Sequence, residues 1–167
     1  MTLPEPKTTS ARQPVQITDD AKVLVLPDAH IPYHDKEALE LAVSHGKKLK
    51  PSIVLINGDF ADNYSFSPHE TDPSKRDLIG ELQTVKQGLE WIEKQFPKAR
   101  VIYKQGNHEL WWDRKLWSKA PELVGLPTTT WEAQVKPDRS RIEFVHHLRS
   151  IQIGTLDRKS TRLNSSH

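Results

Sequence analysis

The stretch SIVLINGDFAD, at residues 52–62, decides the fold that we expect for this chain of 167 residues. It opens with a short apolar run of β-branched and leucine side chains, which is typical of a buried strand. Gly58, Asp59 and Asp62 follow, so polar side chains stand where the strand ends. The same arrangement occurs in KVLVLPDAH at residues 22–30 and in RVIYKQGNHE at residues 100–109. Three predicted strands therefore each lead directly into polar residues.

Helical patterns separate these strands. Apolar residues recur every three or four positions after Asp35, which can cap a helix, and again between Ser74 and Phe96. The patterns predict helices at residues 35–50, 74–96 and 111–119, and two more strands, expected to be antiparallel neighbours, at residues 142–145 and 151–153. Strands that alternate with long helices indicate βαβ units and a mainly parallel sheet. Right-handed crossovers would place the three polar loops at one edge of that sheet, where ligands of open α/β sheets bind.

The composition indicates an ordinary water-soluble domain. Charged residues make up 28% of the chain, hydrophobic residues 35%, and the mean hydropathy is −0.66. No apolar run is long enough to span a bilayer, so no membrane partner is expected. Residues 1–20 are polar and lack the apolar core of a secretory signal, and they are predicted to be a disordered lead-in. Since the chain has no cysteine, a disulfide framework and a thiolate metal site are excluded, and the cytoplasm is the expected compartment.

The last eleven residues, DRKSTRLNSSH at 157–167, have a separate origin in our interpretation. The run back-translates without conflict to a widely used sequencing-library adapter, so residues 157–167 are predicted to be an adapter-derived, artefactual tail. The tail carries three basic residues and one acidic residue. Without it, 21 basic and 21 acidic residues remain, and the formal net charge falls from +2 to zero. The charge therefore does not support binding to nucleic acid.

Side chains of the types that bind metal ions in proteins follow each of the first three predicted strands. They are Asp28 and His30 after the first, Asp59 and Asp62 after the second, and Asn107, His108 and Glu109 after the third. Carboxylates and imidazoles suit divalent metals such as Mn, Fe and Zn. Gly58 and Gly106 are expected to let the backbone turn sharply at the strand ends. Each motif alone also occurs in ordinary turns, so the prediction of a metal site depends on all three motifs after three successive strands.

These motifs resemble those of the calcineurin-like metallophosphoesterases, in particular the stand-alone enzymes of phages and bacteria. The family pattern runs D-x-H, G-D-x-x-D, G-N-H-[DE], then a histidine often followed by glycine, then G-H-x-H. The first three motifs are complete in PDAH, NGDFAD and QGNHE. The last two are missing, because no G-H-x-H occurs and His146 and His147 fall in a strand pattern without a following glycine.

The resemblance covers about residues 22–156 and implies an α/β fold, the four-layer αββα sandwich of metallophosphoesterases. The chain would hold only the N-terminal portion of that sandwich, as a partial domain at residues 21–156. The chain is expected to stop just before the next histidine motif.

The resemblance also implies a binuclear centre of two divalent ions, Mn, Fe or Zn. Asp28 and His30 would bind the first metal, Asp59 would bridge both, and the side-chain oxygen of Asn107 would bind the second. The two metals would activate a water molecule for attack on phosphorus.

The resemblance assigns two further residues to catalysis. His108 would donate a proton to the leaving oxygen or hold a phosphate oxygen. Asp62 would hydrogen-bond to His108 and orient it. Asp62 could instead simply cap a turn or a helix.

The expected function is therefore metal-dependent hydrolysis of a phosphoester, with the chain itself weakened or inactive because the later histidines are missing. The arginines with which protein Ser/Thr phosphatases of this superfamily hold phosphate are absent, since Asn63 follows Asp62 and Gln105 precedes Gly106. One alternative is a metal-dependent nuclease acting on DNA or RNA. The aromatic residues near the motifs could stack on nucleobases or could instead pack into the core; they are Trp111, Trp112, Trp117, Tyr64 and Phe66. The other alternative is a non-catalytic phosphate-binding module.

Overall fold

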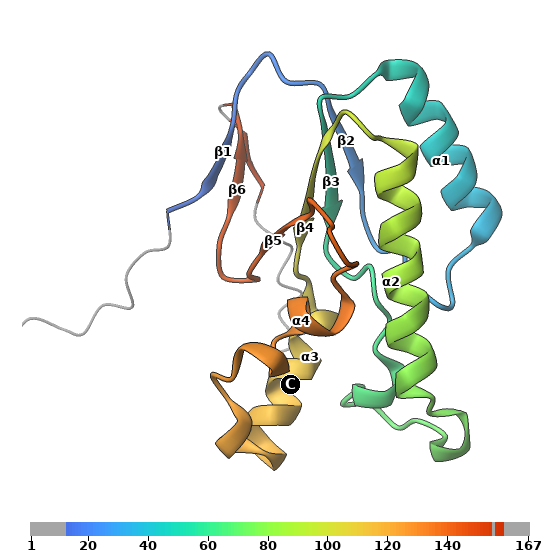
Figure 1. Cartoon of the computed structure of the whole chain (residues 1–167), viewed down its shortest axis with the longest axis vertical. Helices are drawn as coiled ribbons and strands as arrows, with labels where there is room; N and C mark the ends of the chain where they lie inside the picture. Colours follow the sequence, from blue (N-terminus) through green and yellow to red (C-terminus); the bar gives the residue numbers. More distant parts are fainter. Residues whose placement is uncertain (1–12, 155, 159–167) are drawn as a thin grey trace, which may run out of the picture.

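The computed structural model describes residues 13–154 and 156–158, and it contains two β-sheets (Figure 1). The first sheet has four parallel strands in the order β2-β3-β4-β5, namely β2 Val23–Leu26, β3 Ile53–Asn57, β4 Arg100–Lys104 and β5 Glu143–Val145. The second sheet has the order β1-β6-β7, namely β1 Val15–Ile17, β6 Ile151–Ile153 and β7 Leu156–Arg158. The predicted α/β class and the parallel sheet are confirmed.

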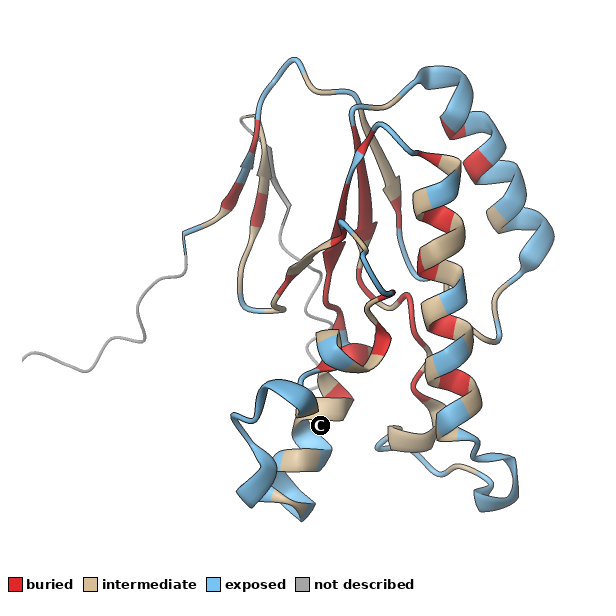
Figure 2. Cartoon of the chain, in the orientation of Figure 1, coloured by how far each residue is buried: buried red, intermediate tan, exposed pale blue. Residues whose placement is uncertain are grey.

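The four-stranded sheet lies between a helical layer and the second sheet. Side chains alternate along β3, so Val54 and Ile56 join one buried cluster with the helices, whereas Ile53 and Leu55 join another with the second sheet. Helices α1 Lys36–Leu49 and α2 Leu78–Gln95 cover the first face, and the side of α2 toward the sheet is buried (Figure 2). Three layers of the expected sandwich, one of helices and two of strands, are therefore present in the described part of the chain.

Carboxylates cap both long helices. The side chain of Asp35 accepts a hydrogen bond from the backbone N–H of Ala38 at 2.9 Å, as its position predicted. The helix expected from Ser74 begins only at Leu78, because Pro73–Lys75 forms a short 3₁₀ turn and Asp77 caps α2 through the N–H of Gly80. None of the helices among the described residues is long and apolar enough to cross a membrane.

Helix α3 spans Asn107–Lys119 and begins four residues before the predicted start at residue 111. Glu109 closes the first turn by accepting the backbone N–H of Gly106 at 2.7 Å, so the polar motif itself is helical. Three 3₁₀ turns at Tyr64–Phe66, Pro121–Leu123 and Pro127–Thr129 and the short helix α4 Trp131–Val135 complete the described elements. Trp131 of α4 is almost fully buried and packs in the helical core.

Two sequence predictions about the strands are wrong. The strands expected to be antiparallel neighbours lie in different sheets, since β5 pairs in parallel with β4 and β6 pairs in parallel with β1. The lead-in predicted to be disordered contains β1, whose Val15 and Ile17 are buried between the sheets, while residues 1–12 lie outside the described residues. Strand β7 includes the first two residues of the predicted adapter-derived tail, and the rest of that tail also lies outside the described residues.

Candidate metal centre

The loops that follow β2, β3 and β4 meet at one edge of the four-stranded sheet. Asp28 and His30 donate backbone hydrogen bonds to the carbonyls of Gly58 and Asp59, at 3.2 and 3.0 Å. A Cβ atom at Gly58 would lie 2.9 Å from the Cα of Gly106, so the second and third loops also touch. The expectation that the sheet brings the three loops together is correct.

The two glycines serve this contact in different ways. Gly58 has a φ of +86°, which side chains rarely adopt, so it does allow the expected sharp turn. Gly106 has a φ of −96° and needs no such freedom. A Cβ there would lie 2.3 Å from Oδ1 of Asp59, so the absence of a side chain permits the close approach of the two loops.

Three of the predicted metal ligands have strained backbones. The φ angles of Asp28, His30 and Asp59 are 50°, 51° and 48°, in the left-handed region that residues other than glycine seldom occupy. Such strain costs on the order of 1–3 kcal/mol per residue and is concentrated at functional sites. The surrounding folded structure therefore keeps these three residues in an unfavourable backbone conformation.

The carboxylate of Glu109 holds two of the loops together. Its Oε2 accepts the backbone N–H groups of Asp59 at 3.0 Å and Gly106 at 2.7 Å, and its Oε1 accepts Ala61 N–H at 3.1 Å and the Tyr103 hydroxyl at 2.7 Å. Glu109 is fully buried, and this burial raises its pKa above the ordinary range. The sequence suggested only that Glu109 was of a metal-binding type, whereas the structure gives it four donors within the protein.

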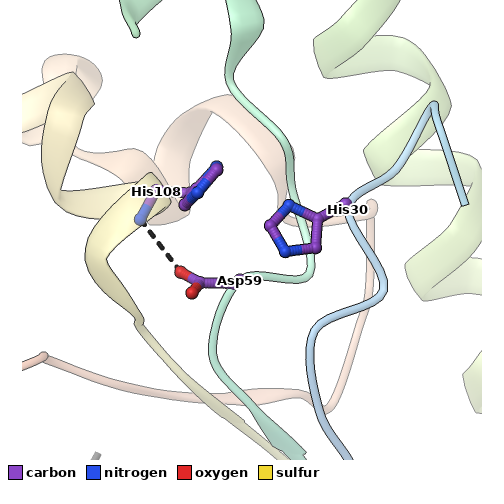
Figure 3. A group of neighbouring side chains, drawn as sticks. All are labelled: His30, Asp59 and His108. Atoms are coloured by element: carbon purple, nitrogen blue, oxygen red, sulfur yellow. Dashed lines mark hydrogen bonds between the residues drawn. The ribbon is translucent and has the colours of Figure 1, made fainter. Parts of the chain in front are cut away.

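His30, Asp59 and His108 converge at this edge (Figure 3). Each offers one ligand atom, and the three atoms lie within 4.8 Å of one another, close enough to share a metal ion. Asp59 also accepts the backbone N–H of His108 at 2.9 Å, drawn as the dashed line in Figure 3. Asp28 is outside this group and exposed, and Asn107 is exposed at the first position of α3.

Asp62 contacts both histidines, though not as the resemblance implied. Its carboxylate lies 3.0 Å from Nδ1 of His30 but 3.9 Å from Nδ1 of His108, which instead lies 2.6 Å from the backbone carbonyl of Asp62. Because a carbonyl and a carboxylate accept hydrogen bonds, both imidazoles carry their proton on Nδ1 in these contacts. The Nε2 lone pair of each ring is then available to a metal or a proton.

Aromatic side chains pack around the histidines. The rings of His108 and Trp111 lie 3.8 Å apart between centroids, and the His30 ring meets His108 edge-on at 4.6 Å. Trp111 is only 8% exposed, so its position does not favour the stacking on nucleobases considered above, whereas Trp117 is exposed. Asn63, whose role was not predicted, is buried and donates from Nδ2 to the carbonyl of His108 at 2.9 Å.

A second group of potential ligands, not predicted from the sequence, lies among the described residues. Asp113 of α3 and the consecutive His146 and His147 have ligand atoms within 4.8 Å of one another. The two histidines follow β5 and are not part of the strand, which corrects the sequence interpretation. Lys104 fixes this turn by donating from Nζ to the carbonyl of His147 at 2.7 Å, and burial lowers its pKa to about 8.

Comparison with known proteins agrees with this geometry. The family model described as calcineurin-like phosphoesterase matches residues 21–164. No curated protein and no solved structure matches the chain at a significant level. Because the match extends over most of the chain, the chain belongs to the calcineurin-like phosphoesterase family.

Proposed function

We propose that this protein hydrolyses a phosphoester at a centre of two divalent cations bound between the loops after β2, β3 and β4. Membership of the family supports metal-dependent phosphoester hydrolysis in general. The number of metals, their identity and the roles of single residues are our proposal. The observation that carries it is the convergence of His30, Asp59 and His108, with the Nδ1 atoms of both imidazoles held by Asp62.

The donor set fits a borderline divalent metal. The His30 imidazole with its free Nε2 atom and the carboxylates of Asp28 and Asp59 suit Mn, Fe or Zn. We propose that Asp28 and His30 hold one ion, that Asp59 bridges to a second, and that Asn107 contributes to the second. When bound, the ions lower the pKa of a coordinated water and neutralise charge on the phosphoryl group.

Contacts within the chain already orient the two histidines for this chemistry. Asp62 orients the His30 ring through its carboxylate and the His108 ring through its carbonyl, so neither imidazole has to be fixed when substrate binds. In our proposal, Nε2 of His108 holds or transfers a proton at the leaving oxygen, while Nδ1 keeps its bond to Asp62. Trp111, packed against His108, limits movement of that ring.

The proposal is tested by metal binding first and by hydrolysis second. Binding of Mn²⁺ would be measured by isothermal titration calorimetry, and hydrolysis by release of p-nitrophenol from p-nitrophenyl phosphate with and without a chelator. Asp59→Asn should weaken Mn²⁺ binding by about tenfold or more, since it removes the bridging charge. The control is Asp138→Asn, at a side chain that is 94% exposed and far from any predicted ligand in sequence.

The two measurements separate the candidate functions. Among the described residues, we assign only Asp59 and Asn107 to the second ion, so we expect slow hydrolysis that the chelator abolishes. Tight Mn²⁺ binding without any hydrolysis would favour the phosphate-binding module. If Asp59→Asn bound Mn²⁺ as tightly as the unsubstituted protein, the proposed centre would be wrong.

A further inference from the structure

A cavity of about 280 Å³ is lined by Tyr33 and Glu81, which lie close enough to Asp62 of the candidate metal centre for its charge to raise the pKa of both. It is formed where the chain leaves the centre, because Pro32 and Tyr33 line it and follow His30 closely in sequence. Other lining residues come from the start of α2, including its cap Asp77 and Glu81 in its first turn. The cavity is near the lower end of the size range of small-molecule sites, so it suits a small group.

Glu81 is the unusual residue of this cavity. It is only 4% exposed, and neither of its carboxylate oxygens has a hydrogen-bond partner. The backbone N–H and the hydroxyl of Ser65 lie close enough to Glu81 to lower its pKa, but neither makes a hydrogen bond of acceptable geometry to the carboxylate. Burial outweighs this effect and raises the pKa of Glu81. A buried carboxylate without a well-formed hydrogen bond is costly and is expected to have a further partner.

No cation of the described residues supplies that partner. The other charged groups that act on Glu81 are the carboxylates of Asp62 and Asp77, which raise its pKa further. Lys75 also lines the cavity, but its side chain is 72% exposed and its Nζ lies 4.0 Å from Asp72. Asp77 is engaged with the first turn of α2 through Gly80 N–H. The cavity therefore has excess negative charge and unused hydrogen-bond acceptors.

We propose that this cavity binds the leaving group of the substrate and that Glu81 accepts a hydrogen bond from a cationic amine on that group. The inference rests on the proposed function, because the phosphoryl group must bind at the neighbouring metal centre. The substrate class is then a small phosphoester whose alcohol portion carries a protonated amine. Tyr33 adds an aromatic ring at the cavity, next to Tyr64 at 5.9 Å between ring centroids, and such rings attract cations.

Two ligands of equal size test this proposal. 2-Aminoethyl phosphate and propyl phosphate have the same number of heavy atoms, but only the first carries an ammonium group. Calorimetry with the Mn²⁺-loaded protein should show about tenfold or greater preference for 2-aminoethyl phosphate, as expected for a hydrogen bond to a charged group. Glu81→Gln keeps the shape and should abolish this preference while leaving the affinity for propyl phosphate unchanged. Glu90→Gln removes the same charge from the same helix outside the cavity and should keep the preference.

Different results would refute different parts of the argument. Equal affinity of the unsubstituted protein for the two ligands, or an unchanged preference in Glu81→Gln, would overturn the assignment of the cavity. This comparison needs no variant to fold, because the unsubstituted protein alone can fail it. If Mn²⁺ does not bind at all, the metal centre and with it the proposed function are wrong. If Mn²⁺ and propyl phosphate bind without any preference for the amine, only the inference about Glu81 is wrong.

Discussion

Replacing Glu109 tests whether one buried carboxylate holds the metal-binding loops together. Glu109→Ala would leave four donors without an acceptor, namely the buried N–H groups of Ala61 and Gly106, the buried hydroxyl of Tyr103 and the part-buried N–H of Asp59. Each buried donor left unsatisfied costs about 1–3 kcal/mol, so the three buried donors alone amount to about 3–9 kcal/mol. Since domains of this size are stable by about 5–15 kcal/mol, Glu109→Ala should unfold the chain or nearly do so.

Glu109→Gln should cost much less, for a geometric reason. Its remaining oxygen can keep the bonds from Asp59 and Gly106, while its NH₂ group faces Ala61 and Tyr103. The Tyr103 hydroxyl can rotate and accept from this NH₂ group, and this new hydrogen bond replaces the one that its own O–H donated. The net loss is then one hydrogen bond, because the N–H of Ala61 has no acceptor. The expected loss is about 1–3 kcal/mol.

Urea unfolding followed by circular dichroism measures both changes. Glu109→Gln should lower the unfolding midpoint by about 1 M, while Glu109→Ala should show no folded baseline or a much lower midpoint. Glu122, exposed in the turn Pro121–Leu123, provides the control, and both substitutions there should change the free energy of unfolding by less than about 0.5 kcal/mol. If Glu109→Ala were within about 1 kcal/mol of the unsubstituted protein, or if both Glu109 variants lost the same amount, the four-donor argument would be refuted.

Three further predictions concern other parts of the fold. Gly106→Ala should destabilise the protein by about 1–3 kcal/mol and weaken Mn²⁺ binding measured by calorimetry, because its Cβ would lie 2.6 Å from the backbone nitrogen of Asp59. Gly125→Ala meets no atom within 4 Å, so although its φ of +94° also makes it destabilising, it should leave Mn²⁺ binding unchanged. Burial lowers the pKa of Lys104 to about 8 from its ordinary 10.5, so the unfolded chain holds this proton more tightly and the free energy of unfolding should rise with pH between these values. Urea midpoints at the two ends of this range should show the rise in the unsubstituted protein and not in Lys104→Met; equal slopes would contradict it. Asp35→Ala should lower the free energy of unfolding by about 0.5–2 kcal/mol by removing the cap of α1, and an unchanged thermal midpoint would show that the cap is unimportant.

Much of the candidate site was predictable because its residues follow strands directly. Apolar runs marked β2, β3 and β4, and parallel strands necessarily bring their carboxyl ends to one edge. His30 and Asp59 were identified in this way, and so was His108, although as a catalytic residue. The geometry of their partners was not predictable. Whether the Asp62 carboxylate contacts His30 or His108 depends on the conformation of the loops. That conformation includes the positive φ angles of Asp28, His30 and Asp59, which depend on contacts between loops that are distant in the sequence.

The sequence by itself determined the order of strands and helices, the parallel sheet and the three polar loops, because these depend on local periodicity and on residue types at strand ends. Only the tertiary structure determined which strands form the second sheet and which carboxylate holds the loops. Strands β1 and β6 have three residues each, too few for a clear alternation, and they pair across nearly the whole chain. Glu109 and Glu81 look alike in the sequence as early helical glutamates, yet one accepts four hydrogen bonds and the other none of acceptable geometry. That difference arises from which donors the folded chain places around each buried side chain.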